Sequence, residues 1–340
     1  MKKVDIYNHI FPDSYWTYML EVAGDHKDLG KRVRAIPMLA DLDVRFRVMD
    51  SFGEDYVQIL SVPAPPPEVL AEPAEAAELM RRANDGMAEL CRKHPERFPT
   101  FTATLAMNNL EASIAEIHRA IGELGARGVE FYTNAKGKPL DLPEFEPIFQ
   151  IMAEEYDLPI WVHPIRPPAF PDYLTEDKSK YEVWWTFGWP YETSVFMARI
   201  VFGGYFDRYP NLKIITHHLG GMVPYFEGRV GPGWAQLGSR TSDEDYSGIL
   251  PGLKKPHLEY FKDFYADTAV FGSASATRCG LDFFGEDRVV FASDAPFDPE
   301  GGPMYIRDTI RILDELEISD EARRKIYCGN AETLMKVQFN

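Results

Sequence analysis

Four ionisable side chains that can bind a metal or move a proton stand at the ends of apolar segments. His9 ends the first of these segments, and His163, His218 and Asp294 end three later ones. Near-continuous apolar runs are typical of buried parallel strands, and barrel enzymes keep their chemistry at the carboxyl ends of such strands. We therefore expect the four side chains to meet at one rim.

This set of residue types fits a catalytic metal site. Imidazole and carboxylate ligands without thiolates suit zinc, or manganese or iron where more oxygen is present. His9, His163 and Asp294 supply the three protein ligands that leave one position open for chemistry. One histidine alone would be read as a satisfied core residue, but three at strand ends with an aspartate favour metal or proton-transfer chemistry.

Two adjacent histidines end the third of these segments. His218 lies at the very end of the predicted strand, beside a Gly-Gly pair that allows close backbone approach, so we assign it the acid/base role. Because neighbouring strand residues point to opposite faces, we expect His217 to pack outside the barrel.

The elements that would position these residues alternate along the chain. Helical patterns lie between most of the strand-like runs, and the alternation predicts an α/β fold, a closed (β/α)8 TIM barrel. An open doubly wound sheet would carry a glycine-rich loop after its first strand, where this chain has Phe11-Pro12-Asp13. The predicted strands are 4–9, 56–62, 98–105, 128–133, 159–163, 212–217, 264–270 and 288–294, and the predicted helices are 74–94, 110–124, 142–156, 191–206, 273–284 and 305–316.

We find no linker or repeat, so residues 1–340 are predicted to form a single domain. Residues 14–42 and 165–190 read as insertions, and long loops at the catalytic rim of a barrel usually cover the substrate.

Composition limits the partners. The formal charge of −17 argues against binding to nucleic acid or an anionic membrane, which needs clustered Lys and Arg. A small anionic substrate would need a local cation such as Arg166, Arg229 or Arg240. The three cysteines show no C-x-x-C spacing, and the N-terminus lacks the apolar stretch of a signal peptide, so the cytoplasm is the expected location.

Several blocks of this sequence resemble one known family. The chain is similar to the amidohydrolase-related family 2 proteins of the amidohydrolase superfamily, and most of all to the branch named for aminocarboxymuconate semialdehyde decarboxylase. The resemblance runs through nearly the whole barrel. It rests on the blocks 5–10, 44–50, 60–63, 161–164, 203–210, 218–229, 264–267, 293–297 and 329–331.

Carried over by position, the resemblance implies roles for individual residues and a homodimer, in which the arginine matching Arg229 reaches the neighbouring site. The metal would be zinc, as is usual in that branch. The implied residues are the metal ligands His9, His163 and Asp294, the catalytic base His218, and the substrate-side residues Arg229, Trp185 and Phe297.

Tyr7 departs from the family pattern, which has His-x-His or Glu-x-His where this chain has Tyr7-Asn8-His9. Three interpretations follow: a three-residue metal site with Tyr7 facing the substrate nearby, a tyrosinate ligand, or a site that has lost its metal. A neutral phenol is a poor ligand, although a cation could favour the phenolate. Glu130 is expected to compensate as a ligand or, as we favour, to hold water or Tyr7.

The resulting hypothesis is a metal-dependent, non-oxidative decarboxylase, a carboxy-lyase for an unsaturated or aromatic carboxylic acid, with no organic cofactor. His218 would move the proton, with Asp294 as a possible relay, and Arg229 would neutralise the carboxylate. The aromatic run 184–189 favours a flat substrate. Two alternatives stay open: a metal-dependent hydrolase or hydratase of a related carboxylate, and a non-catalytic ligand-binding barrel.

Overall fold

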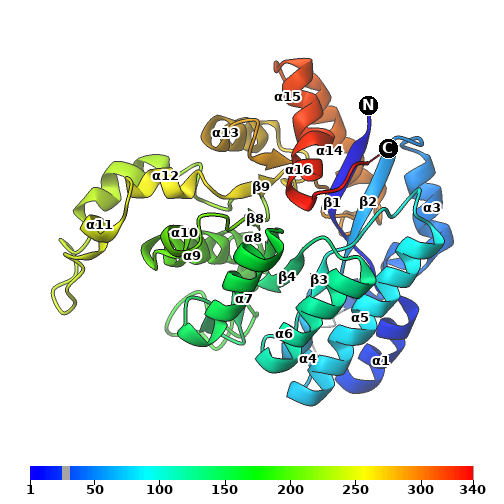
Figure 1. Cartoon of the computed structure of the whole chain (residues 1–340), viewed down its shortest axis with the longest axis horizontal. Helices are drawn as coiled ribbons and strands as arrows, with labels where there is room; N and C mark the ends of the chain where they lie inside the picture. The colour runs from blue at the N-terminus through cyan, green and yellow to red at the C-terminus, as the bar shows by residue number, and fades with distance from the viewer. Residues whose placement is uncertain (25–30, 340) are drawn as a thin grey trace.

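Eight parallel strands close into a barrel in the computed structural model, which describes residues 1–24 and 31–339 (Figure 1). β1 pairs with β2, a bridge from Leu60 to Phe101 continues to β3, and six strands follow in the order β3-β4-β7-β8-β9-β10. Backbone bonds from Ile6 N to Phe291 O and from Asp294 N to Tyr7 O, both 3.0 Å, return the last strand to the first. The predicted (β/α)8 barrel is confirmed. Its strands are β1 (Lys3–His9), β2 (Tyr56–Ser61), β3 (Ala103–Thr104), β4 (Val129–Tyr132), β7 (Ile160–His163), β8 (Ile214–Thr216), β9 (Tyr265–Asp267) and β10 (Val289–Val290).

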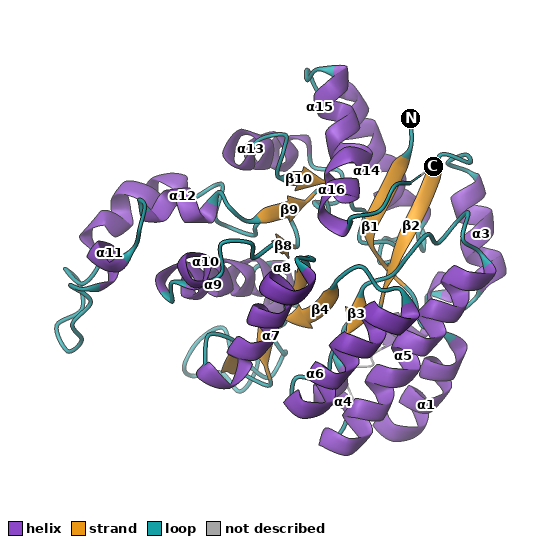
Figure 2. Cartoon of the chain, in the orientation of Figure 1, coloured by secondary structure: helices purple, strands orange, loops and turns teal. Residues whose placement is uncertain are grey.

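Helices surround this barrel, as Figure 2 shows, and a short hairpin of β5 (Asn134–Ala135) and β6 (Lys138–Pro139) follows β4. Several helices begin at a side-chain cap: Asp41, Asn109 and Ser273 each accept a backbone N–H of the first turn. Among the described residues, no helix is long and apolar enough to cross a membrane. The helices are α1 (Asp13–Ala23), α2 (Lys31–Arg34), α3 (Leu42–Asp50), α4 (Pro67–Leu70), α5 (Pro73–Lys93), α6 (Leu110–Arg119), α7 (Glu146–Gln150), α8 (Val183–Thr186), α9 (Gly188–Phe202), α10 (Tyr205–Arg208), α11 (Ile249–Gly252), α12 (His257–Phe261), α13 (Ala274–Phe284), α14 (Pro303–Glu315), α15 (Asp320–Arg324) and α16 (Asn330–Met335).

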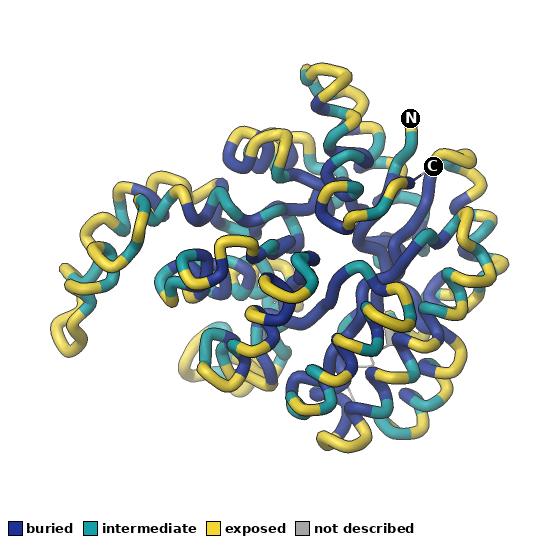
Figure 3. Tube along the Cα trace, in the orientation of Figure 1, coloured by how far each residue is buried: buried dark blue, intermediate teal, exposed yellow. Residues whose placement is uncertain are grey.

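The interior of the barrel has an apolar layer beneath a polar one. Val4, Val57, Trp161, Ile215 and Val290 pack together from five strands in one buried cluster. Side chains alternate between the two faces of a strand, so residues two places further along point into the barrel again. On β7 and on the segment that follows β8, that place holds His163 and His217, which are also buried. Figure 3 shows that the chain is buried throughout this central region.

A β-bulge in β1 sets the direction of its two functional side chains. Asp5 pairs with Gln58 and Asn8 pairs with Leu60, so two residues, Ile6 and Tyr7, oppose one residue of β2. An extra residue of this kind bends the strand and re-aims a side chain. As a result Ile6 and Tyr7 both lie in the inner cluster, and the ring of Tyr7 lies 5.0 Å from that of His9.

Both predicted rim insertions contain helices. The first holds α1, which packs on α5 so closely that a Cβ on Gly86 would lie 2.4 Å from the Cβ of Pro12. This contact explains a glycine inside a long helix, where it is otherwise unfavourable. Residues 25–30 of this insertion lie outside the described residues. The second insertion ends in α8 and the start of α9.

A buried carboxyl group lies beside the barrel on α4. Glu68 is fully buried and neither of its oxygens has a hydrogen-bond partner of good geometry among the described residues. Burial raises the pKa of Glu68 to about 7, against weaker opposing effects from backbone N–H groups and Lys136. The folded protein therefore holds this group protonated where the unfolded chain would release the proton.

We predict that Glu68 makes stability depend on pH in a defined direction. Because the folded pKa lies above the unfolded one, its stabilising contribution is complete below pH 4.5 and is lost as the pH rises through 7. Glu68→Gln should therefore gain about 2 kcal/mol relative to the parent between pH 5 and pH 8. Urea unfolding at the two pH values measures this gain. The exposed Glu72→Gln is the matched control, and an equal pH dependence in both variants would contradict the prediction.

Candidate active site

His9 and Asp294 meet where the last strand joins the first. The Nε2 atom of His9 lies 3.0 Å from an Asp294 carboxylate oxygen, and both side chains are buried. The other ring nitrogen of His9, Nδ1, lies 3.1 Å from the hydroxyl of Ser61. That hydroxyl donates its hydrogen to the backbone oxygen of Asn8 at 2.8 Å, so it accepts from His9. The neutral ring therefore directs the lone pair of Nε2 toward the centre of the rim.

His163 ends β7 with its ring held in the same manner. Its Nδ1–H donates to the carbonyl of Pro164 at 2.6 Å, which leaves Nε2 free. The ring lies 5.7 Å from that of His9. The two imidazoles and the Asp294 carboxylate proposed from the sequence as metal ligands are thus brought together at one rim.

His217 faces into the barrel, so the expectation that it packs outside is wrong. Its ring lies 4.4 Å from Tyr7 and 5.5 Å from His163, and one nitrogen each of His9, His163 and His217 lie within 4.8 Å of one another. Ile215 already points inward, and alternation returns the chain to the interior two residues later. Alternation counted from Ile215, rather than from the end of the predicted strand, would have predicted that His217 points into the barrel.

His218 reaches the same space because the strand has already ended. Its φ of 56° and the φ of 50° at Leu219 are left-handed conformations that turn the backbone, so adjacent histidines no longer point to opposite faces. The Nε2 atom of His218 lies 3.7 Å from Asp294, and neither ring nitrogen has a hydrogen-bond partner among the described residues. Both histidines therefore contribute to the site.

The Gly-Gly pair after these histidines serves protein packing. A Cβ on Gly220 would lie 2.7 Å from Phe284, and one on Gly221 would lie 2.4 Å from the carbonyl of Pro190. Both glycines have positive φ. The sequence led us to expect a ligand close to this backbone, whereas the atoms that pack against both glycines belong to the protein itself.

Electrostatics keep one carboxylate charged among mostly neutral imidazoles. Burial lowers the pKa of His9, His163 and His218, so these rings are held in the neutral form that binds metals. Burial also lowers the pKa of His217, but the Asp267 and Asp294 carboxylates outweigh it and raise the value to about 9. The pKa of Asp294 is raised by burial, yet the surrounding imidazoles hold it well below its ordinary value.

Tyr7 does not direct its hydroxyl toward these imidazoles. The hydroxyl donates to the Glu130 carboxyl group at 2.5 Å, and the other Glu130 oxygen has no partner among the described residues. Burial and the nearby Glu130 raise the pKa of Tyr7 well above its usual value, so it remains a phenol. Burial raises the pKa of Glu130 to about 8. Of the roles considered for Glu130, holding Tyr7 is the one that the contacts show.

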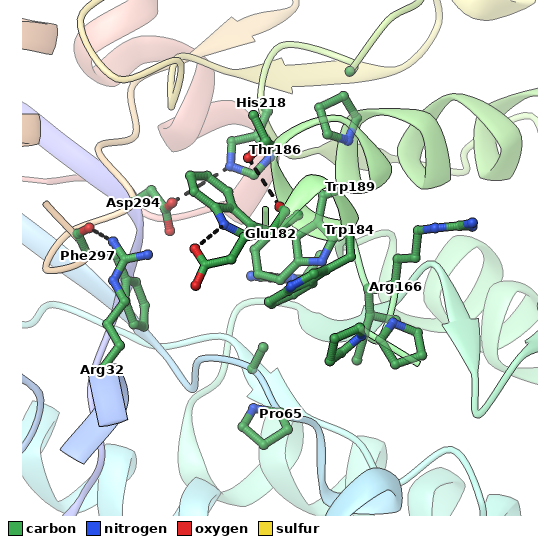
Figure 4. A pocket seen from close by; sticks show the side chains of 18 of the residues that line it. Arg32, Pro65, Arg166, Glu182, Trp184, Thr186, Trp189, His218, Asp294 and Phe297 are labelled. Atoms are coloured by element: carbon green, nitrogen blue, oxygen red, sulfur yellow. Dashed lines mark hydrogen bonds and ion pairs between the residues drawn. The ribbon is translucent and has the colours of Figure 1, made fainter. Parts of the chain in front are cut away.

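An aromatic cavity of about 870 Å³ opens above this rim and is lined by His163, His218 and Asp294. Figure 4 shows His218 and Asp294 beside it. Trp184 and Trp189 face it from the second insertion, and Trp189 lies 5.2 Å from the ring of His163. Of the substrate-side residues proposed from the sequence, Trp185 and Phe297 line this cavity, whereas Tyr7 lies buried beneath it.

The arginines considered for a substrate carboxylate fall in different places. Arg32 lines the cavity and donates to the backbone oxygen of Phe297 (Figure 4). Arg166 also lines it, but Glu192 neutralises its guanidinium at 2.9 Å. Arg45 is fully buried and donates to Gln58 and to the backbone of β1, so it supports the strand that carries His9.

Arg229 and Arg240 lie together in a second, smaller cavity and line no part of the first. Arg229 is exposed at the base of the segment that leads to α11 and α12, which extends away from the barrel in Figure 1. Within one chain, Arg229 therefore does not meet the rim histidines.

Comparison with known proteins places this barrel in a family. The Amidohydrolase family profile matches residues 22–336. The chain is 32% identical to the gamma-resorcylate decarboxylase of Polaromonas sp., with 87% of each chain covered, and 29% identical to the 2-amino-3-carboxymuconate-6-semialdehyde decarboxylase of Dictyostelium discoideum, covering 97% of this chain and 90% of that one. The chain therefore belongs to the Amidohydrolase family, as its sequence blocks predicted.

Solved structures agree with this assignment. The 5-carboxyvanillate decarboxylase of Novosphingobium aromaticivorans, complexed with manganese and 4-hydroxy-3-methoxy-5-nitrobenzoic acid, superposes with a TM-score of 0.81 at 27% identity. The match covers 99% of this chain and 96% of that one. A barrel similar to this one over nearly the whole chain therefore binds manganese in that relative.

We predict that the Tyr7 hydroxyl and Glu130 stabilise the fold as a pair. Tyr7→Phe leaves the carboxyl group buried without its donor, which should cost about 1–3 kcal/mol of unfolding free energy. In a Glu130→Leu background the same change should cost much less. Denaturant unfolding of the two single variants and the double variant measures this coupling. Tyr132→Phe, in the same strand layer but without a bond to Glu130, is the control. Additive effects for Tyr7 and Glu130 would contradict the pair.

Proposed function

We propose that this protein removes carbon dioxide, without oxidation, from an aromatic acid that carries a hydroxyl group next to its carboxylate. The observation that carries the proposal is the position of His218, an imidazole without hydrogen-bond partners among the described residues, at the inner end of an aromatic cavity and beside ionised Asp294. Two similar proteins, which act by their names on gamma-resorcylate and 5-carboxyvanillate, support this choice of substrate class.

A divalent metal is the cofactor for which these residues provide donors. His9, His163 and Asp294 would hold it, since two neutral imidazoles and a carboxylate converge there. In each imidazole a hydrogen bond occupies Nδ1 and leaves Nε2 available for the metal. Such an ion polarises the substrate's oxygens and stabilises negative charge on them. Manganese agrees with the bound ion of the carboxyvanillate enzyme, and zinc with the donor types.

His218 is proposed to move the proton. Its lowered pKa keeps it neutral, so it can accept the proton that the substrate's hydroxyl gives up. It then donates this proton to the ring carbon that bears the carboxylate. The bond to the carboxylate breaks, carbon dioxide leaves, and the electron pair of that bond restores the aromatic ring as a phenolate, which takes up a proton from water. Asp294 stabilises the imidazolium form of His218 between these two transfers.

The cavity fits a flat anion. Trp184, Trp185 and Trp189 offer ring faces for an aromatic substrate, and Phe297 lies 5.6 Å from the ring of His9. Arg32 lines this cavity and has no carboxylate partner among the residues that the structure describes, so we assign it to the substrate's anionic groups.

A homodimer in the cytoplasm completes the proposal. Tyr225 and Phe226, just before Arg229 at the base of the projecting segment, are exposed, with 80% and 37% of their surface accessible. Aromatic residues are enriched at the cores of protein interfaces. A second chain packed against this segment would bury them and bring Arg229 close to a neighbouring cavity.

The reaction is tested by product analysis. With gamma-resorcylate as the first probe, we expect carbon dioxide release and, in D₂O, one deuterium at the carbon that lost its carboxylate. His218→Ala should lower kcat by about 10²- to 10⁴-fold, because the proton donor is missing. Incorporation of solvent oxygen into the product would instead identify a hydrolase or hydratase. Unchanged kcat in His218→Ala would refute the assigned base.

Arg32 gives a second prediction. Arg32→Met should raise KM for an aromatic carboxylate at least about tenfold, because an uncompensated carboxylate in the cavity loses a charge-assisted hydrogen bond of about 1.5–3 kcal/mol. Arg34→Met is the matched control, since Arg34 lies on the same short helix but bonds to the Gly24 carbonyl and lines no part of the cavity. Equal KM values for both variants would exclude Arg32 from substrate binding.

A further inference from the structure

The structure assigns His217 as an additional protein ligand of the metal at this rim, with Asp267 as the residue that positions it. This inference rests on the proposed metal site, which the function above uses with His9, His163 and Asp294 alone. It adds a third imidazole, from the residue that directly follows β8. The sequence motifs did not indicate a metal ligand at this position.

The first argument is the common orientation of three rings. His9, His163 and His217 each present Nδ1 to an oxygen that lies away from the centre: the Ser61 hydroxyl at 3.1 Å, the Pro164 carbonyl at 2.6 Å and the Asp267 carboxylate at 2.5 Å. A neutral imidazole that donates from Nδ1 has its lone pair on Nε2. Metal-bound histidines characteristically have such an oxygen partner on the other nitrogen. His217 has the same anchored orientation as the other two histidines, and it offers the same lone pair once a metal replaces the proton on its Nε2 atom.

The second argument is the position of the free nitrogen. One nitrogen of each ring lies within 4.8 Å of the others, and His217 also forms a second group of this kind with His218 and Asp294. Nitrogens bound at about 2.1 Å to one tetrahedral ion lie roughly 3.4 Å apart, so small side-chain rotations bring three rings onto an ion. His217 is the residue that the two groups share.

The third argument is an unsatisfied buried atom. The Nε2 atom of His217 is buried, lies 3.5 Å from Asp294 and makes no hydrogen bond of good geometry with the described residues. A buried polar atom without a partner is costly, and a bound cation would satisfy it. Asp267 and Asp294 already favour positive charge here, and a metal supplies it in place of a proton.

Alternative assignments for this place fit less well. Tyr7 packs edge-on against His217 with its hydroxyl committed to Glu130, so it supports the imidazole ring rather than a metal. His218 points into the cavity from a turn, and Asp267 holds only its backbone N–H, at 3.0 Å. A ring without an anchored nitrogen is suited to proton transfer, and an anchored ring is suited to ligation.

The adjacent histidines allow a matched experiment. The parent, His217→Ala and His218→Ala proteins are stripped with a chelator and titrated with MnCl₂, and bound manganese is measured by elemental analysis and by EPR of the free ion. We expect His217→Ala to bind Mn²⁺ at least about 100-fold more weakly than the parent, and His218→Ala to bind within about threefold of it. Pulsed EPR of the bound ion should detect one fewer coupled ¹⁴N nucleus in His217→Ala at saturating manganese, and no change in His218→Ala.

Asp267→Asn tests the positioning residue and guards against misfolding of the alanine variant. It keeps the size of the side chain, and loss of this type of partner typically weakens metal binding 10–100-fold. Circular dichroism and thermal unfolding of the stripped proteins establish that each variant is folded. Equal manganese affinity and an equal ¹⁴N count in the parent and His217→Ala would overturn the inference, as would a parent that binds no Mn²⁺.

These readouts do not depend on turnover, so the two proposals can fail separately. A parent that binds manganese through His217 but releases no carbon dioxide from any aromatic acid would refute the function and leave the ligand assignment intact. A parent that releases carbon dioxide, but whose His217→Ala variant binds manganese normally, would refute the ligand assignment and leave the function intact.

Discussion

The buried negative charge of Asp294 is the constraint on which the rim of this barrel depends. An isolated carboxylate in an apolar interior is too costly to persist, so it must be compensated by positive charge or by donors. Here the positive charge comes from His217, whose pKa is raised to about 9 and which lies 3.5 Å from the carboxylate, while the rings of His9 and His218 lie 3.0 and 3.7 Å away. The carboxylate keeps its charge only because β1 and β8 bring those rings to it, and barrel closure between β10 and β1 makes that meeting possible.

The apolar layer below the rim is what gives these polar groups their fixed geometry. Trp161 and Ile215 fill the barrel two residues before His163 and His217, so each of these polar side chains starts from a packed and rigid backbone. Arg45 extends the same support outside the barrel, where its guanidinium binds oxygens of β1 and β2. Rigid placement matters because proton transfer and metal binding tolerate errors of only about 0.5 Å.

The sequence was sufficient for the elements and for the rim, but not for every direction in which a side chain points. Apolar runs with strand periodicity located all eight strands, and polar residues at their ends identified His9, His163, His218 and Asp294 as neighbours. The direction of His217 was missed because the alternation was counted from the predicted strand end and not from buried Ile215, whereas His218 reaches the rim only through a turn of positive φ beyond the last strand residue, Thr216. The β1 bulge was equally hidden, since it arises from how two strands pair and not from either strand alone.

Arg229 shows a different limit of the sequence. Its exposed position within one chain can be described, whereas its place in an assembly depends on a second chain.

The pair of Tyr7 and Glu130 explains how a barrel can lack an imidazole at one inward position without acquiring another buried charge. Burial raises the pKa of Glu130 to about 8 and that of Tyr7 well above its usual value, so at neutral pH both groups are mainly protonated and share a short hydrogen bond. A neutral pair adds no charge to compete with Asp294 for the surrounding imidazoles. It also fills space: the phenol ring packs at 4.4 Å against His217 and at 5.0 Å against His9, and so restricts both rings to the orientations in which their free nitrogens converge. The aromatic ring of Tyr7 therefore acts on the site through packing. A metal ligand that position 7 does not supply would come from the segment that follows β8, where His217 lies.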